Sequence, residues 1–246
     1  MRIIISPAKK MRMAEELPWR DYPALLSQTE ILMNHIQGLS YEEAKALWKC
    51  NDQIAALNAG RFANMNLTGN VSPAILSYEG IQYQYMAPGV FEEKSLEWLQ
   101  RHLCILSGFY GILRPMDGIV PYRLEMQART KLEEYKDLYD FWKDRIYAEV
   151  TKDTHIILNL ASKEYSKCIE KYLNEKDIFI TCVFAEEVNG KLVQKGTFAK
   201  MARGEMVRYL AEIQAESPEE AKTFRRLGFT FLQEESTDTR YVFVKR

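Results

Sequence analysis

Metal-binding and redox side chains are scarce in this sequence. Its 246 residues include only three histidines and four cysteines, and no C-x-x-C pair occurs. Zinc sites and dithiol redox centres need closely spaced ligands, so the spacing predicts no metal and no cofactor of that kind. Cys104 stands between Leu103 and Ile105, which is typical of a buried thiol.

Long apolar runs are also missing, so no segment suits a transmembrane helix. The N-terminal MRIIISPAKK is too weakly apolar for a signal peptide and lacks a small-residue cleavage site. We therefore expect a cytoplasmic protein with no membrane partner. No repeat, linker or low-complexity stretch divides the chain, so we expect one domain over residues 1–246.

An excess of positive charge is absent as well. The formal net charge is -1, which argues against attraction of the whole molecule to nucleic acid. Basic residues nevertheless gather in three segments that contain no acid: residues 9–12, 101–114 and 191–203. Such segments favour phosphate binding, but chance clustering on a charge-rich surface gives the same pattern.

The apolar patterns predict strands and helices in irregular alternation. The predicted strands are 2–6, 155–160, 178–185, 191–198, 229–233 and 240–245, with Asn189-Gly190 as a hairpin turn. The predicted helices are 23–37, 41–49, one after Asn51, 131–150 and one from 199, and Ser40 and Asn51 are N-caps. Residues 73–86 are expected to be extended. This mixture predicts a mixed α/β (α+β) domain rather than a regular doubly wound sheet.

Residues 92–126 join a predicted helix to a glycine turn. Leucines at steps of three and four predict a helix over residues 92–106 that ends at Gly108. Gly108 and Gly111 frame a tight turn before Arg114-Pro115. Bare N–H groups at such a turn can bind a phosphate, and the turn looks like the hairpin of helix-hairpin-helix DNA-binding motifs, in which the glycines are one residue closer. The alternative is a buried turn without a ligand.

Candidate polar residues stand where predicted strands end. Ser6 and Lys9 follow the first strand, at the edge where α/β proteins place ligands. Asn159 and Ser162 lie at a strand-to-helix junction, which also favours anions. Ser162 is more typical of a helix N-cap, since no G-x-S-x-G elbow is present and no histidine follows closely.

Two further pairs of charged residues are candidates for a site, one pair of opposite charge and one pair of like charge. Residues 121–126 alternate as a strand would, so Arg123 and Glu125 share one face, either as an ion pair or as part of a polar site. Lys200 and Arg203 lie together on the first turn of the helix predicted from residue 199. Cations at that end oppose the helix dipole, which favours a bound anion nearby.

Several motifs of the chain resemble those of a known family. The motifs are ISPAK, LSGFYGILRP, PYRLEM, NLAS-x-EY and AK-x-ARG, and they span nearly the whole sequence. They resemble the YaaA family of bacterial peroxide stress proteins. The resemblance implies the irregular α/β "cantaloupe" fold with a helix-hairpin-helix element, a basic cleft and binding to double-stranded DNA. It also implies protection from hydrogen peroxide by limiting free intracellular iron.

Two functional hypotheses follow. The first is a DNA-binding protein of the peroxide response, which contacts phosphates through Lys9, Lys10, Gly108, Gly111, Arg114, Arg123, Lys200 and Arg203. The second is an enzyme acting on a nucleotide, a base or another anionic small molecule, with Ser6, Glu125, Asn159 and Ser162 as catalytic candidates. A convergent pocket would favour the enzyme, and an open groove of duplex width would favour simple binding.

Overall fold

The strand β1 (Arg2–Ile5) lies inside the main sheet of the computed structural model, which describes residues 1–14, 18–130, 132 and 134–245. Its isoleucines are completely buried. Two parallel strands, β5 (Leu103–Ser107) and β8 (Ile156–Asn159), flank β1 on either side. A continuous β-branched run suits this place because both faces of the strand are covered.

The main sheet is mixed. Its order is β11 (Phe229–Phe231), β12 (Arg240–Lys245), β9 (Ile178–Val188), β8, β1, β5, β6 (Gly111–Leu113), with β10 (Lys191–Val193) paired to β9. The strands from β12 to β5 run parallel, whereas β6, β10 and β11 are antiparallel to their neighbours. Asn189 and Gly190 both have positive φ and form the predicted hairpin turn. Two small pairs lie outside this sheet: β2 (Lys10–Met11) with β4 (Tyr78–Glu79), and β3 (Ser72–Pro73) with β7 (Gly118–Ile119).

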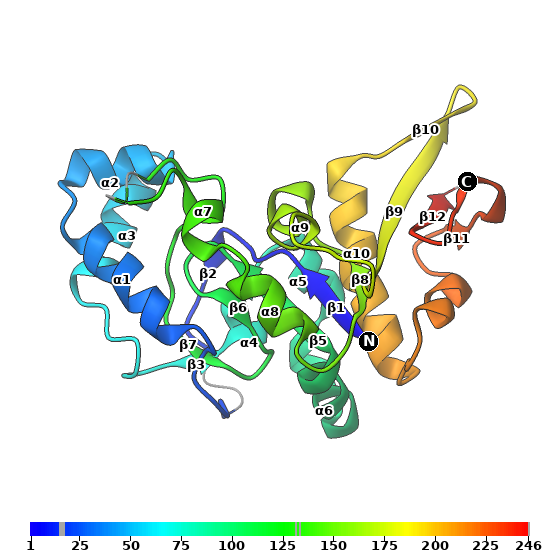
Figure 1. Cartoon of the computed structure of the whole chain (residues 1–246), viewed down its shortest axis with the longest axis horizontal. Helices are drawn as coiled ribbons and strands as arrows, with labels where there is room; N and C mark the ends of the chain where they lie inside the picture. The colour runs from blue at the N-terminus through cyan, green and yellow to red at the C-terminus, as the bar shows by residue number, and fades with distance from the viewer. Residues whose placement is uncertain (15–17, 131, 133, 246) are drawn as a thin grey trace.

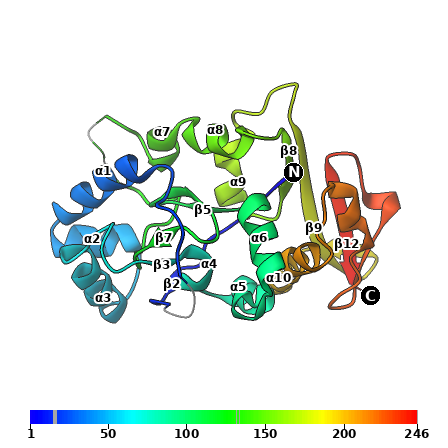
Figure 2. The same cartoon turned by 90° about the horizontal axis from the view of Figure 1, so that it is seen from below.

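Helices cover both faces of the sheet. The α-helices are α1 (Leu26–Gln37), α2 (Tyr41–Trp48), α3 (Asp52–Ala63), α4 (Ala74–Ser77), α5 (Ile81–Met86), α6 (Glu93–His102), α7 (Leu138–Trp142), α8 (Arg145–Thr151), α9 (Lys163–Glu170) and α10 (Gly196–Glu212). Short 3-10 helices are η1 (Pro88–Val90), η2 (Pro218–Thr223) and η3 (Gln233–Glu235). Figure 2 shows α8 and α9 on one face and α5, α6 and α10 on the other. Helices α1, α2 and α3 gather at one end of the molecule, opposite β11 and β12 (Figure 1).

Residues 103–107 form a strand, so the helix predicted over residues 92–106 was too long. Helix α6 ends at His102, and β5 starts at Leu103. Both faces of β5 are buried, and its unbroken apolar run therefore lacks the two-residue alternation that separates a strand from a helix. The glycine turn joins β5 to β6, so a helix-hairpin-helix element does not form at these glycines.

Two other predicted elements were wrong. Residues 73–86 fold as α4, β4 and α5 rather than as extended chain. The helix predicted over residues 131–150 starts at Leu138 and is broken at Lys143, whose φ is 49°, before α8 begins; Lys131 lies outside the described residues. Residues 121–126 keep the predicted alternation of buried and half-exposed side chains, although these described residues form no strand.

One hydrophobic cluster runs through the molecule. It includes Ile4 of β1, Phe62 of α3, Trp142 of α7 and Phe243 of β12, which come from distant parts of the chain. The mixed α/β fold and its single domain are thereby confirmed. Within the described ranges, no helix combines the length and the apolar character needed to cross a membrane.

Candidate functional site

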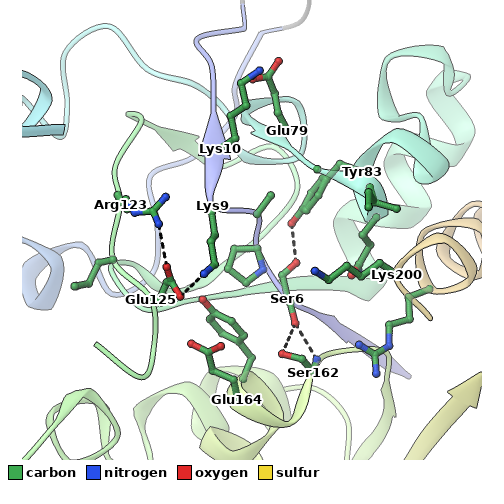
Figure 3. A pocket seen from close by; sticks show the side chains of 18 of the residues that line it. Ser6, Lys9, Lys10, Glu79, Tyr83, Arg123, Glu125, Ser162, Glu164 and Lys200 are labelled. Atoms are coloured by element: carbon green, nitrogen blue, oxygen red, sulfur yellow. Dashed lines mark hydrogen bonds and ion pairs between the residues drawn. The ribbon is translucent and has the colours of Figure 1, made fainter. Parts of the chain in front are cut away.

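The strand order creates a crevice at the carboxyl end of β1. From β1 the chain first adds β5 on one side and later adds β8 on the other. Ligands of open α/β sheets bind where the direction of strand addition reverses in this way. A pocket of about 410 Å³ opens at this point, beside Ser6 after β1 and Ser162 after β8 (Figure 3).

Most of the predicted site residues meet in this pocket. Its lining includes Ser6, Lys9, Lys10, Arg123, Glu125, Ser162, Lys200 and Arg203. The other predicted site residues are not in its lining: Asn159, Gly108, Gly111 and Arg114. The pocket therefore unites most of the candidates, and it leaves out Asn159, Arg114 and the glycine turn.

Ser6 and Ser162 bond to each other where α9 begins. The Ser162 backbone N–H donates to Ser6 Oγ at 2.8 Å, and the two hydroxyl oxygens lie 3.2 Å apart. The Tyr83 hydroxyl donates to the Ser6 carbonyl at 3.1 Å. Ser162 occupies the predicted N-cap position, but its side chain bonds Ser6 instead of the helix. Within the described part of the chain, neither serine hydroxyl contacts a histidine or carboxylate, so neither has the adjacent base that an activated nucleophile needs.

One side of the pocket is acidic. Glu125 accepts a contact from Lys9 Nζ at 2.8 Å and from Arg123 Nη2 at 3.4 Å, and Arg123 Nε also donates to the Trp48 carbonyl at 3.3 Å. Glu164 lines the same side. Burial raises the pKa of Glu164, although the Gln127 backbone N–H donates to it. Arg123 and Glu125 thus form an ion pair that is also part of a polar site.

The other side is basic. Lys200 and Arg203 come from the second turn of α10, because this helix begins at Gly196, three residues before the predicted start. Figure 3 shows Lys200 extending toward Ser6, across the pocket from Lys9 and Glu125. Arg203 Nε is buried without a hydrogen-bond partner in the described structure, and burial lowers the pKa of this guanidinium. At the outer edge, Lys10 pairs with Glu79 at 3.0 Å.

The glycine turn is closed by its own chain, which argues against the predicted anion site at Gly108 and Gly111. Ser107 Oγ accepts the N–H groups of Phe109 at 3.1 Å and Tyr110 at 2.9 Å. The turn is buried, and a Cβ on Gly108 would lie 2.5 Å from the Leu124 carbonyl oxygen. Glycine is needed here for close backbone packing, and the N–H groups are not exposed to a phosphate.

Arg114 and Asn159 make hydrogen bonds to buried parts of the fold. The Arg114 backbone N–H donates to Asp117 Oδ2 at 2.8 Å, and its Nη1 donates to Cys104 Sγ at 3.4 Å. The Asn159 amide oxygen accepts the Ala161 N–H at 2.9 Å, and its Nδ2 donates to Thr181 Oγ1 at 3.2 Å. Both side chains are thus occupied by contacts away from the pocket lining, and Asn159 is not positioned for catalysis there.

Several lining residues were not predicted as site residues, among them Glu79, Gln82, Tyr83 and Glu164. Glu164 stands inside the NLAS-x-EY motif, which was a usable signal. Gln82 and Tyr83 belong to α5, in a segment that was predicted to be extended. The predicted conformation therefore did not indicate that these side chains face the pocket. In the described residues, no group of three or more His, Cys, Asp or Glu side chains is arranged to hold a metal ion.

Similar proteins match this chain over all or nearly all of its length. The family model described as peroxide stress protein YaaA matches residues 1–235. A UPF0246 protein of Lachnoclostridium phytofermentans is 55% identical over 246 residues, which cover 100% of this chain and 96% of that protein. UPF0246 proteins of Agathobacter rectalis and Ligilactobacillus salivarius are 53% and 48% identical, and the matches cover 100% of this chain and 99% and 100% of those proteins. The chain therefore belongs to the YaaA family of peroxide stress proteins.

Proposed function

We propose that this protein acts in the peroxide stress response by binding double-stranded DNA through its phosphates. The observation that carries the proposal is the convergence of five basic side chains on one concave site of a molecule with a net charge of -1: Lys9, Lys10, Arg123, Lys200 and Arg203. Local concentration of positive charge attracts phosphates even when the whole molecule is not basic. The proposal requires a cytoplasmic protein.

Phosphate contacts position a duplex without reading its sequence. Fluorescence anisotropy with two unrelated duplexes is the test. We expect similar affinities that fall with salt, with a log–log slope of about -0.9 for each neutralised phosphate. Absence of binding at low salt, or binding that ignores salt, would reject the proposal.

The proposal includes a lower level of free intracellular iron, which the sequence resemblance to the family implies. Chelatable iron should rise in cells that lack the protein and return to normal when the wild-type chain is restored. The Lys200→Ala, Arg203→Ala double variant should fail to restore it if the pocket carries the function. Restoration by this variant would separate iron control from the pocket.

A second function is favoured by the size of the pocket and its acidic side. Cavities of about 300–1,000 Å³ hold small molecules, and the pocket, at about 410 Å³, also contains Glu125 and Glu164. A carboxylate there can act as acid or base on a nucleotide or a base. Incubation with nucleotides and with damaged oligonucleotides, followed by mass spectrometry, tests this. Product formation that Glu125→Gln and Glu164→Gln do not reduce would reject these roles.

A further inference from the structure

Two buried donors in the pocket have no partner in the described structure. They are Arg203 Nε and Gln82 Nε2, and the Gln82 side chain is only 7% exposed. Burying such a group without a hydrogen bond costs about 1–3 kcal/mol in proteins. Unsatisfied donors at a concave surface therefore leave a place where an acceptor, such as a water or a ligand oxygen, can bind.

The fold brings the helices that carry these two donors close together. Gly204 follows Arg203 on α10, and a Cβ at this position would lie 2.0 Å from the Gln82 carbonyl oxygen on α5. The two helices thus touch backbone to backbone beside the pocket, and Gly204 makes this contact possible. The backbones that carry the donors are held by this packing, which suits a site that recognises one chemical group.

Other positive groups surround the same place. Lys200 stands three residues before Arg203, and Figure 3 shows it extending toward Ser6. The amino end of α9 begins at Ser162 in the same wall, with the partial positive charge of its helix dipole. No carboxylate pairs with Lys200 or Arg203 in the described part of the chain, in contrast to Lys9, Lys10 and Arg123.

The opposite side of the pocket is unsuitable for a second anion. Glu125 and Glu164 line it, and both would repel another phosphate. Carboxylates instead accept hydrogen bonds from hydroxyl or amino groups. The pocket thus has an end for an anion and an end for hydrogen-bond donors.

From this arrangement we propose that the pocket binds the terminal phosphate monoester of a nucleotide. The phosphate lies against Arg203, Gln82 and Lys200, and the sugar hydroxyls lie toward Glu125 and Glu164. A monoester carries a charge of about -1.5 to -2, which matches two unpaired cations better than the single charge of a diester. The inference rests on the proposed function, because it names the phosphate that the site takes.

Calorimetric titration with adenosine monophosphate tests the inference, with inorganic phosphate and adenosine as partial ligands. We expect the nucleotide to bind more tightly than either part. Gln82→Leu and Arg203→Met should each weaken it about 10-fold or more, since each removes a donor to a charged group. Neither change breaks a described protein hydrogen bond, so thermal melting should remain at or above wild type. Arg208→Ala, on α10 but outside the pocket lining, is the matched control and should bind as wild type does.

Duplexes with and without a 5′-phosphate distinguish the source of the monoester. Preference for the phosphorylated end, lost in Arg203→Met, assigns the site to DNA ends; nucleotide binding without this preference assigns it to free nucleotides. Salt-dependent duplex binding without variant-sensitive binding of either monoester would overturn the inference and leave the proposed function intact. Variant-sensitive nucleotide binding without any duplex binding would support the inference and reject the proposed function. Inorganic phosphate binding as tightly as the nucleotide would also overturn it, because the acidic end would then contribute nothing.

Discussion

The glycine turn at residues 107–111 and the pocket at the end of β1 differ in how their donors are satisfied. Both follow a buried strand of the main sheet, and basic residues occur in the sequence near each. In the turn, Ser107 Oγ accepts two backbone N–H groups, and the Tyr122 hydroxyl bonds the same oxygen at 2.6 Å. In the pocket, Arg203 Nε and Gln82 Nε2 have no partner within the described structure.

This difference separates packing from binding. A glycine, a basic residue and a strand end are common to both regions, and they do not by themselves mark a ligand site. What distinguishes the regions is whether the chain supplies its own acceptor. A donor that is already paired in the interior stabilises the fold, whereas a buried donor left unpaired costs stability until a ligand arrives.

A buried charge should destabilise the fold near the glycine turn more than in the pocket. Asp117 should give the largest effect on the free energy of unfolding. This residue follows the glycine turn, and burial raises its pKa to about 7. The folded state then keeps a proton that the unfolded state loses between about pH 4 and pH 7, so the free energy of unfolding falls as pH rises through this window. The full loss above pH 7 is on the order of 4 kcal/mol, at ~1.4 kcal/mol for each pH unit.

Asp117→Asn should remove this loss. The amide oxygen can still accept the Arg114 N–H, but no charge is buried. Urea unfolding should show a variant more stable than wild type near pH 8 and equal to it near pH 4. Equal stabilities near pH 8 would mean that the Asp117 carboxylate is stabilised by something other than these contacts.

The packing of the turn gives the next largest effect. Gly108→Ala should destabilise the fold by about 3 kcal/mol, because the added Cβ meets backbone atoms that cannot move aside cheaply. Gly60→Ala is the matched control, because Gly60 lies inside α3 with nothing within 4 Å of the new Cβ. This variant should increase the free energy of unfolding by up to ~1 kcal/mol. Urea unfolding measures both. A Gly108→Ala protein with wild-type stability and reduced DNA affinity would instead support the turn as a binding site.

In the pocket the same kind of test should affect binding and spare stability. Lys200→Ala and Arg203→Ala should each weaken nucleic-acid or nucleotide binding by about 10- to 100-fold, which is ~1.5–3 kcal/mol. Their melting temperatures should be at or above wild type, because each removes a cation without a carboxylate partner in the described structure. Wild-type affinity in the double variant would remove this side of the pocket from the site.

Local signals in the sequence predicted local structure. The buried β1, the Asn189-Gly190 hairpin and the N-caps Ser40 and Asn51 are confirmed, since each depends on residues next to one another in the chain. The placement of Ser6 after β1 and Ser162 after β8 also indicated that these residues meet in one pocket, because parallel strands present their carboxyl ends at one edge.

Distant contacts were not predictable in the same way. Whether residues 103–107 form a helix or a strand depended on the burial of both faces, which the apolar run does not encode. Nothing near Gly108 shows that Tyr122 and Leu124 will close over it. Gln82 lines the pocket on α5, where α10 packs against its backbone at Gly204, a contact between distant parts of the chain.

The smallest effect should come from Arg123, which combines both behaviours within the pocket. Its side chain is 11% exposed and holds Glu125 and the Trp48 carbonyl, so Arg123→Ala leaves a carboxylate with less compensation. Lys9 still contacts Glu125 at 2.8 Å, which limits the loss to about 1–2 kcal/mol rather than the 3–5 of a fully buried pair. Affinity should fall less than in Arg203→Ala, since the charge of Arg123 is already neutralised. Adding Glu125→Gln should recover part of the stability by removing the stranded charge. Unchanged unfolding together with a loss of affinity as large as that of Arg203→Ala would instead place Arg123 with the unpaired cations, and the division of the pocket into two ends would be wrong.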